Sequence, residues 1–148
     1  MQILKVQKED IGIIFEIDKN NFTYDSYNVD TLNNYIIDKN ILFLKIVENN
    51  EIIAYSIVLF TKPEAELLKI CVKNLYRNKG FAKLLLDYNI EYLINNNFEN
   101  IFLEVRSDNY KAIKLYEKLG FSKYNERKNY YKNPNADAFL YKKSLISI

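Results

Sequence analysis

Two short stretches of the sequence carry residue types that could do chemistry. The first, Arg77 to Lys83, places basic and small residues between an apolar run and a helical pattern. A strand-to-helix junction presents backbone N–H groups and the positive end of a helix dipole, which together bind phosphate. A plain turn would explain Gly80 but not the basic residues beside it. The second stretch contains Glu104, a carboxylate inside the apolar run Ile101 to Val105.

Glu104 is the candidate general base. Alternation along a strand puts Phe102 and Glu104 on one face, and Leu103 and Val105 on the other. A half-buried carboxylate costs free energy unless it is paired or functional, and burial favours the higher pKa that a base needs near neutral pH. The sequence contains no His, so acid–base chemistry has to use carboxylate, Tyr, Lys or Cys. The alternative is a structural salt bridge from Glu104 to Arg106 or a lysine.

The elements that must position these residues follow from the periodicity of apolar positions. The short polar turn 49–51 joins two strand-like runs as a hairpin. The expected strands cover 1–6, 41–48, 52–60, 66–72, 100–105, 121–126 and 136–141, with helices over 8–15, 29–36, 80–93 and 110–119, and with Tyr130, Tyr131 and Pro134 in a loop between the last two strands. This order predicts a mixed α/β (α+β) sheet with helices on both faces.

Length and composition limit the classes of protein further. The chain has 148 residues and suits one domain, 1–148. No apolar run approaches the roughly 20 residues that span a bilayer, so we expect a cytoplasmic protein that does not bind membranes. A formal charge of +2 with dispersed lysines does not favour nucleic acid. Cys71 is the single cysteine, so we expect no intramolecular disulfide and no zinc cluster of Cys and His ligands.

The motifs resemble one known superfamily. Arg77-Asn78-Lys79-Gly80-Phe81-Ala82 fits the acyl-CoA-binding signature Arg/Gln-x-x-Gly-x-Gly/Ala of the GNAT superfamily of N-acetyltransferases. Downstream, the chain is similar to RimI-type N-alpha-acetyltransferases in Leu103–Asn109, Ala112, Leu115–Phe121, Tyr130-Tyr131 and Asp137-Ala138. The resemblance covers Glu66 to Tyr141.

The resemblance implies a GNAT fold and acetyl-CoA as the co-substrate, with no metal. That fold has about seven mostly antiparallel strands and a V-shaped splay between the fourth and fifth. The pantetheine arm would bond the strand backbone before the loop, and the loop would cradle the pyrophosphate. The implied cofactor-binding residues are Ile70, Cys71, Val72, Arg77, Asn78, Lys79, Gly80, Phe81, Ala82, Lys83 and Asn109. Asn109 could equally be a simple helix cap, and Cys71 is inert packing rather than a nucleophile.

The resemblance also implies roles in catalysis. Glu104 would draw a proton from the incoming ammonium through water, and the Tyr116 phenol would protonate the departing CoA thiolate. Tyr116 could instead be a core aromatic. Candidates for the acceptor groove are Phe22, Tyr24, Tyr130 and Tyr131, which could equally be surface residues. RimI-type enzymes often carry Pro-Trp-Ser where this chain has Phe22-Thr23-Tyr24-Asp25, so the acceptor loop differs.

We therefore expect direct transfer of acetyl from acetyl-CoA to a primary amine, foremost the N-terminal α-amine of a protein such as a ribosomal protein. Two alternatives stay open. One is a small-molecule N-acetyltransferase acting on a polyamine, an amino acid or an antibiotic. The other is a non-catalytic CoA-binding module. The protein is expected to be a monomer or a homodimer.

Overall fold

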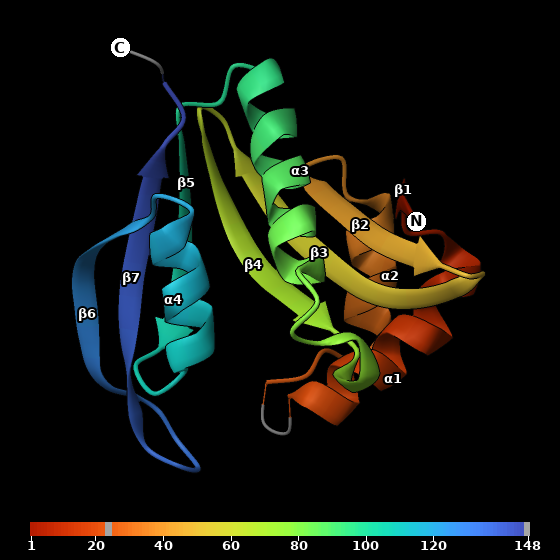
Figure 1. The fold of residues 1–148 in the computed structure, drawn as a ribbon, viewed down its shortest axis with the longest axis horizontal. Helices are drawn as coiled ribbons and strands as arrows, with labels where there is room; N and C mark the ends of the chain where they lie inside the picture. The colour runs from red at the N-terminus through yellow and green to blue at the C-terminus, as the bar shows by residue number, and fades with distance from the viewer. Residues whose placement is uncertain (23–24, 147–148) are drawn as a thin grey trace. The chain divides into compact units, whose positions relative to one another are not determined.

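The computed structural model describes residues 1–22 and 25–146, and its elements follow the predicted order (Figure 1). These elements are β1 (Gln2–Lys5), η1 (Lys8–Asp10), α1 (Ile11–Asn21), α2 (Val29–Ile37), β2 (Ile41–Glu48), β3 (Glu51–Thr61), β4 (Glu64–Val72), η2 (Asn74–Tyr76), α3 (Phe81–Asn95), β5 (Asn100–Arg106), α4 (Tyr110–Lys118), β6 (Ser122–Tyr131) and β7 (Ala136–Ser144). The strands form a mixed seven-stranded sheet in the order β1-β2-β3-β4-β5-β7-β6, which confirms the predicted class. Across the described residues, we find no helix with the length and apolarity that a bilayer crossing needs.

Two compact units divide the chain. The first unit comprises residues 1–60 and 68–89, and the second comprises residues 61–67 and 90–148. Strand β4 and helix α3 therefore contribute residues to both units.

In the first unit, β2 and β3 form the predicted hairpin. Asn49 and Asn50 both have positive φ, 50° and 62°, as the tightest hairpin turns require. Asparagine tolerates this conformation better than most residues, which explains why the sequence places it there. Both strands are buried along most of their length, as expected for strands covered on two faces.

Helices cover both faces of the first unit's sheet. Tyr55 and Ser56 are neighbours on β3 and therefore point to opposite faces. The Tyr55 hydroxyl donates to Asp18 on α1, whereas Ser56 Oγ accepts from Asn89 Nδ2 on α3 at 2.9 Å. Figure 1 shows α1 and α2 behind β2 and β3 and the start of α3 in front of β3. The core on the α1 side includes buried Ile14.

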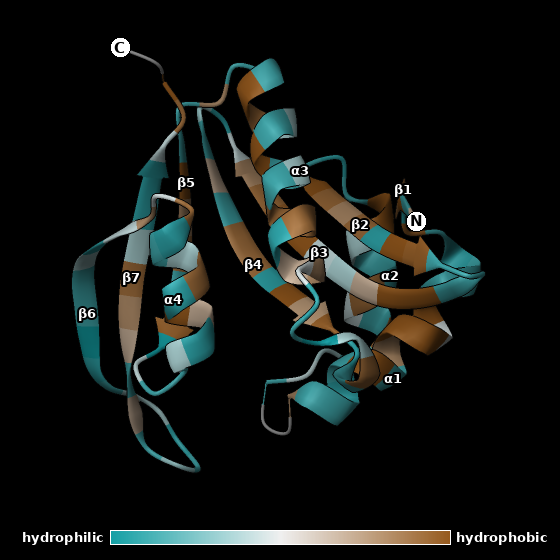
Figure 2. Cartoon of the chain, in the orientation of Figure 1, coloured by the Kyte–Doolittle hydropathy of each residue, from teal (hydrophilic) through white to brown (hydrophobic). Residues whose placement is uncertain are grey.

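In the second unit, β7 pairs antiparallel with β5 on one side and with β6 on the other. Helix α4 packs against this sheet, where the Tyr141 hydroxyl donates to Glu117 at 2.9 Å. Figure 2 shows that β6 is hydrophilic along most of its length, and its residues are mostly exposed. An exposed polar edge strand resists pairing with other chains.

The parallel pairing of β4 and β5 is short. It runs from Glu64 opposite Asn100 to Leu67 opposite Leu103. Helix α3 supplies the crossover that a parallel pair needs. The parallel ladder ends at Leu103, one residue before Glu104.

The prediction that Tyr130 and Tyr131 lie in a loop is wrong. Strand β6 extends through Tyr131, which pairs with Ala136 on β7. The Asn129 backbone N–H also donates to Asp137 Oδ1 at 2.8 Å. These bonds continue the β6–β7 hairpin beyond Glu126, where the predicted strand ended. The apolar pattern alone therefore could not show where the turn between the two strands begins.

Candidate active site

The loop 77–83 lies in the first unit and turns twice through left-handed backbone. Asn78 has φ of 61° and Gly80 has φ of 85°. Such alternation brings successive N–H groups to one side and forms an anion-binding concavity. The Gly80 carbonyl then accepts from Leu84 N–H at 3.0 Å, so α3 begins here and presents the N–H groups of its first turn. The loop therefore has the backbone geometry of a phosphate cradle.

The basic side chains of this loop have different roles. Arg77 Nε donates to the Val72 carbonyl at 3.2 Å, and its guanidinium also donates to Asn21, so Arg77 ties the loop to the end of β4 and to α1. Lys79 lies over the Tyr76 ring, 5.7 Å from its centroid. Lys83 pairs with Asp87 one helical turn later, at 2.8 Å. Positive charge is thus gathered at the start of α3, on exposed residues.

Gly80 is required by backbone conformation rather than by internal packing. A Cβ built on Gly80 meets no protein atom within 4 Å, so its φ of 85° is what favours glycine. The backbone here is open to close approach by a ligand, which fits a pyrophosphate held by N–H groups.

We expect Gly80→Ala to weaken acetyl-CoA binding about tenfold, because the new methyl group stands over the cradle and left-handed backbone costs an alanine about 1 kcal/mol. Isothermal titration calorimetry with acetyl-CoA measures the change. Gly120→Ala is the control for backbone conformation, since Gly120 has φ of 92° and lies outside the loop; its new methyl group would displace the flexible end of the Lys143 side chain, 2.8 Å away. That control should lose comparable stability and keep its acetyl-CoA affinity. Equal affinity losses in both variants would assign the effect to the fold.

The predicted pantetheine strand is the end of β4, also in the first unit. Ile70 is half-buried, and Cys71 and Val72 are buried. Burial raises the pKa of the Cys71 thiol to about 12. The thiol is therefore neutral at physiological pH and a poor nucleophile, in agreement with the packing role expected for it.

Glu104 lies on β5 in the second unit, with the alternation that the sequence predicts. Ile101, Leu103 and Val105 are buried and the residues between them are half-buried. The Glu104 side chain is 29% exposed and lies 3.4 Å from Arg127 Nε on β6. The partner expected in the structural alternative was Arg106 or a lysine, but Arg106 pairs with Asp108 at 3.0 Å. An ion pair of the kind expected in the structural alternative is therefore present, with Arg127 as the partner, and the carboxylate is still partly exposed.

Glu66 on β4 is a further carboxylate on the face of the sheet that carries Glu104, and sequence reasoning missed it. Its Cα partner is Phe102, and Phe102 shares a face with Glu104. Burial is the main cause that raises the pKa of Glu66, and the charge of Glu104 adds to it. The sequence signal was a glutamate between Ala65 and Leu67, both buried in the strand. A perturbed carboxyl beside the candidate base is typical of functional sites.

Tyr116 lies on α4 in the second unit and is 7% exposed. Its ring packs on Phe121, with centroids 5.8 Å apart. Burial raises the pKa of the phenol to about 12, and the neighbouring Tyr131 adds a smaller contribution. Tyr116 is therefore a core aromatic whose hydroxyl is protonated at neutral pH.

Asn109 is the N-cap of α4. Its Oδ1 accepts from the Ala112 backbone N–H at 3.3 Å. The helix-cap alternative is therefore confirmed, and contact with a cofactor stays a prediction.

The aromatic candidates for the acceptor groove are divided between the units. Tyr130 and Tyr131 meet edge to face in the second unit, with ring centroids 5.2 Å apart, and Tyr130 is 49% exposed. The Arg127 guanidinium lies 5.4 Å from the Tyr130 ring, so the pair adjoins the partner of Glu104. Phe22 lies in the first unit against Lys69, and Tyr24 lies outside the described residues.

Within residues 1–22 and 25–146, no group of three or more His, Cys, Asp or Glu side chains is placed to hold a metal ion. The ligand chemistry of the described site is that of backbone N–H groups, carboxylates and phenols.

Comparison with known proteins identifies the family. The model of the acetyltransferase (GNAT) family matches residues 11–121, three quarters of the chain, and the chain belongs to this family. The matched region includes the loop 77–83, Glu104 and Tyr116.

Two sequence relatives and one solved structure are named for the same activity. The [ribosomal protein bS18]-alanine N-acetyltransferase of Haemophilus influenzae is 43% identical over 94 residues, and that of Escherichia coli K12 is 36% identical over 90 residues. These matches span 64% and 61% of both chains, somewhat less than two thirds of the relatives' length. The crystal structure of the ribosomal-protein-S18-alanine N-acetyltransferase from E. coli superposes with a TM-score of 0.92 at 26% identity, covering 99% of this chain and 95% of that one. The predicted GNAT fold is confirmed.

Proposed function

We propose that this protein transfers acetyl from acetyl-CoA to the N-terminal α-amine of a ribosomal protein of the bS18 kind. The observation that carries the proposal is the similarity to the E. coli S18-alanine N-acetyltransferase, which extends over 99% of this chain. The sequence relatives of the same activity support it, although they align over less than two thirds of their length. With such an acceptor, we infer a cytoplasmic protein.

The donor half of the reaction is assigned to residues of the first unit. Acetyl-CoA, when bound, supplies the thioester that the amine attacks. The N–H groups of loop 77–83 would hold its pyrophosphate, and backbone groups of Ile70 to Val72 would bond its pantetheine arm. The left-handed backbone at Gly80 and the charge at Lys79 support this assignment.

The catalytic half is assigned to residues of the second unit. Glu104 accepts the proton of the incoming ammonium through one or more waters, so that the free amine can attack. The Tyr116 phenol gives its proton to the departing thiolate, which restores neutral CoA thiol. Glu66 adds a second carboxyl group on the face of the sheet that carries Glu104, where an incoming ammonium can be bound. Tyr130 and Tyr131 are assigned to the acceptor, and Asn109 to the cofactor.

The test is acetyl transfer to a peptide that carries the N-terminus of the organism's own bS18 protein. We expect free thiol to be released and the peptide to gain one acetyl group at its α-amine, measured by thiol titration and mass spectrometry. The matched control peptide has the same sequence with a blocked N-terminus and should not react. Thiol release with polyamines or free amino acids but not with any free peptide N-terminus would overturn the proposed acceptor. Acetyl-CoA binding without turnover on any amine would overturn the proposed catalysis.

A further inference from the structure

Lys69 is a cation that the proposed reaction does not use, and it is buried in the first unit. It lies on β4 directly before Ile70, and its side chain is only 8% exposed. Its Nζ lies 2.9 Å from Oδ1 of Asp18 on α1, whose side chain is fully buried. A buried ammonium and carboxylate are tolerated only when they are paired and hydrogen-bonded. The Lys69–Asp18 ion pair therefore fixes β4 against α1 in this unit.

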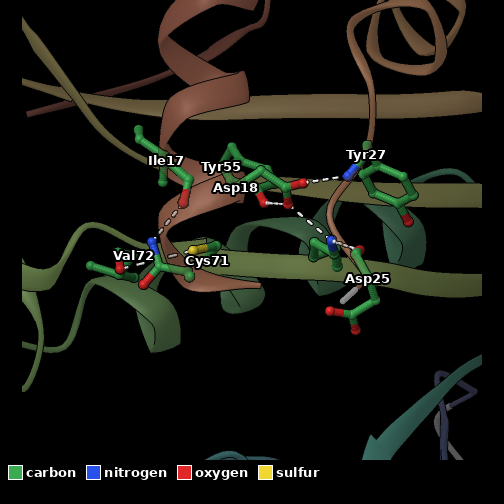
Figure 3. Close-up of polar contacts among 9 residues, drawn as sticks. Ile17, Asp18, Asp25, Tyr27, Tyr55, Cys71 and Val72 are labelled. Atoms are coloured by element: carbon green, nitrogen blue, oxygen red, sulfur yellow. Dashed lines mark hydrogen bonds and ion pairs between the residues drawn. The ribbon is translucent and has the colours of Figure 1, made fainter. Parts of the chain in front are cut away.

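Asp18 links α1, on which it lies, to β3, to β4 and to the segment between α1 and α2. It accepts from Lys69, from the Tyr55 hydroxyl on β3, and from the Tyr27 backbone N–H at 2.6 Å. Figure 3 shows the Asp18 carboxylate between Tyr55 and Tyr27. Burial raises the pKa of Tyr55 well above its usual value, so its hydroxyl keeps the proton that it donates.

The same lysine also binds the segment between α1 and α2. We define the acceptor segment as Phe22 together with residues 25–27. Lys69 Nζ donates to the Asp25 carbonyl at 2.7 Å and lies 4.1 Å from the ring centroids of both Phe22 and Tyr27. Two ring faces, a carbonyl and a carboxylate thus surround one ammonium, and cation–π attraction is strongest where water is excluded.

The two ends of the acceptor segment are set locally by helix caps. Phe22 N–H donates to the Asp18 carbonyl at the end of α1, and Asn28 Oδ1 caps α2 by accepting from Thr31 N–H. Between these caps, Asp25 and Tyr27 bond to Lys69 and Asp18. Lys69 therefore links the acceptor segment to the strand that carries Ile70, the first of the residues assigned to pantetheine.

We propose that Lys69 is a positioning residue for acceptor recognition: its ammonium, held by Asp18, fixes the acceptor segment in the conformation that binds the substrate peptide. This inference rests on the proposed function and on the sequence-based prediction that Phe22 belongs to the acceptor groove. Lys69 suits this role because its ammonium is charged and donates hydrogen bonds both to Asp18 and to the Asp25 carbonyl. A neutral side chain of equal length would leave the Asp18 carboxylate without its cation and release the Asp25 carbonyl.

The first experiment compares steady-state kinetics of the wild-type protein, Lys69→Met and Lys69→Arg with the bS18 peptide. In Lys69→Met we expect the KM for the peptide to rise about tenfold, because a misplaced binding loop loses well-oriented contacts. The KM for acetyl-CoA should stay within about twofold, since the loop 77–83 is unchanged. Lys69→Arg retains the charge and both donors and should restore most of the peptide affinity. An unchanged peptide KM in Lys69→Met would overturn the inference.

Lys45→Met is the matched control for a loss of stability. Lys45 on β2 forms a similarly buried ion pair with Asp10 in the same unit, and both side chains are 11% exposed. Neither residue contacts the acceptor segment in any described hydrogen bond. Both variants should unfold at lower temperature, but only Lys69→Met should raise the peptide KM. A comparable rise of peptide KM in both variants would assign the effect to general destabilisation and overturn the inference.

Hydrogen exchange separates failure of this inference from failure of the proposed function. The Tyr27 amide, which donates to Asp18, should lose protection in Lys69→Met and keep it in Lys45→Met. This readout requires no turnover. If the wild-type protein does not acetylate the peptide, the proposed function fails whatever the exchange rates are. If the peptide is acetylated but the Tyr27 amide stays protected in Lys69→Met, the positioning role fails alone.

Discussion

Replacing Glu104 by glutamine should lower kcat with the bS18 peptide by about 10²- to 10⁴-fold, the range that a lost general base accounts for. Glutamine has nearly the same shape but cannot accept the ammonium proton. The ion pair with Arg127 is also lost, but Arg127 is 56% exposed and can be hydrated, so little stability should go with it. Acetyl-CoA affinity should be unchanged because the donor residues are untouched. Rapid-mixing thiol release and calorimetry measure the two quantities.

Glu126→Gln is the control for removing one negative charge from this sheet. Glu126 lies on β6, is 34% exposed, and pairs with Lys123 and Lys128 at 3.4 Å and 3.3 Å. It matches Glu104 in exposure and in having a basic partner, but it has no assigned role. Its kcat should equal that of the wild-type protein. A Glu104→Gln variant that turns over at the wild-type rate would remove Glu104 from the mechanism.

The features that the sequence predicted well are those set by neighbouring residues. The alternation of buried and half-buried residues along β5 was evident in Ile101 to Val105, and it placed Glu104 on the correct face. The loop 77–83 was likewise evident from its basic and small residues between an apolar run and a helical pattern, and Gly80 in it has positive φ. Local periodicity and local backbone chemistry decide both features, so one sequence is enough.

Features that depend on pairing between distant segments could not be predicted. Glu66 comes beside the face of Glu104 only because β4 pairs parallel with β5 in one register. Arg127 reaches Glu104 across β7, the strand between β6 and β5. Neither neighbour can be deduced from spacing along the chain, since a register shift of one residue would move each side chain to the other face.

Lys69 had a sequence signal that was not used. It stands inside the apolar run of β4, between Leu68 and Ile70, where a lysine is costly unless it is paired. Its partner Asp18 sits on the buried side of α1, among apolar residues at helical spacing. Two opposite charges, each on an otherwise apolar face, could have been paired as a hypothesis. What the sequence could not show is that the pair also binds the acceptor segment.

Replacing Tyr116 by phenylalanine should lower kcat by about 10²-fold, the lower end of the range for a lost general acid, because water can protonate a thiolate in part. The phenol pKa is raised to about 12, so the neutral donor form is favoured in the fold. The neutral Tyr116 phenol therefore contributes its full stability to the fold below the pKa of the unfolded chain, about 10. This contribution is lost as the pH rises through the higher pKa of the folded state. The wild-type kcat should show no falling limb up to about pH 10, where an unperturbed tyrosine would begin to ionise.

Tyr141→Phe is the matched control for Tyr116→Phe. Tyr141 lies on β7 in the same unit, is 2% exposed, and donates to Glu117 at 2.9 Å. Burial and this bond raise the pKa of its phenol to about 12 as well, with burial the larger cause. Loss of its hydroxyl should lower the unfolding temperature, because a buried hydrogen bond disappears, while kcat is retained. If Tyr141→Phe reduces kcat as much as Tyr116→Phe does, the two phenols matter only for packing. If the Tyr116→Phe rate equals the wild-type rate across the whole pH range, the thiolate receives its proton from elsewhere.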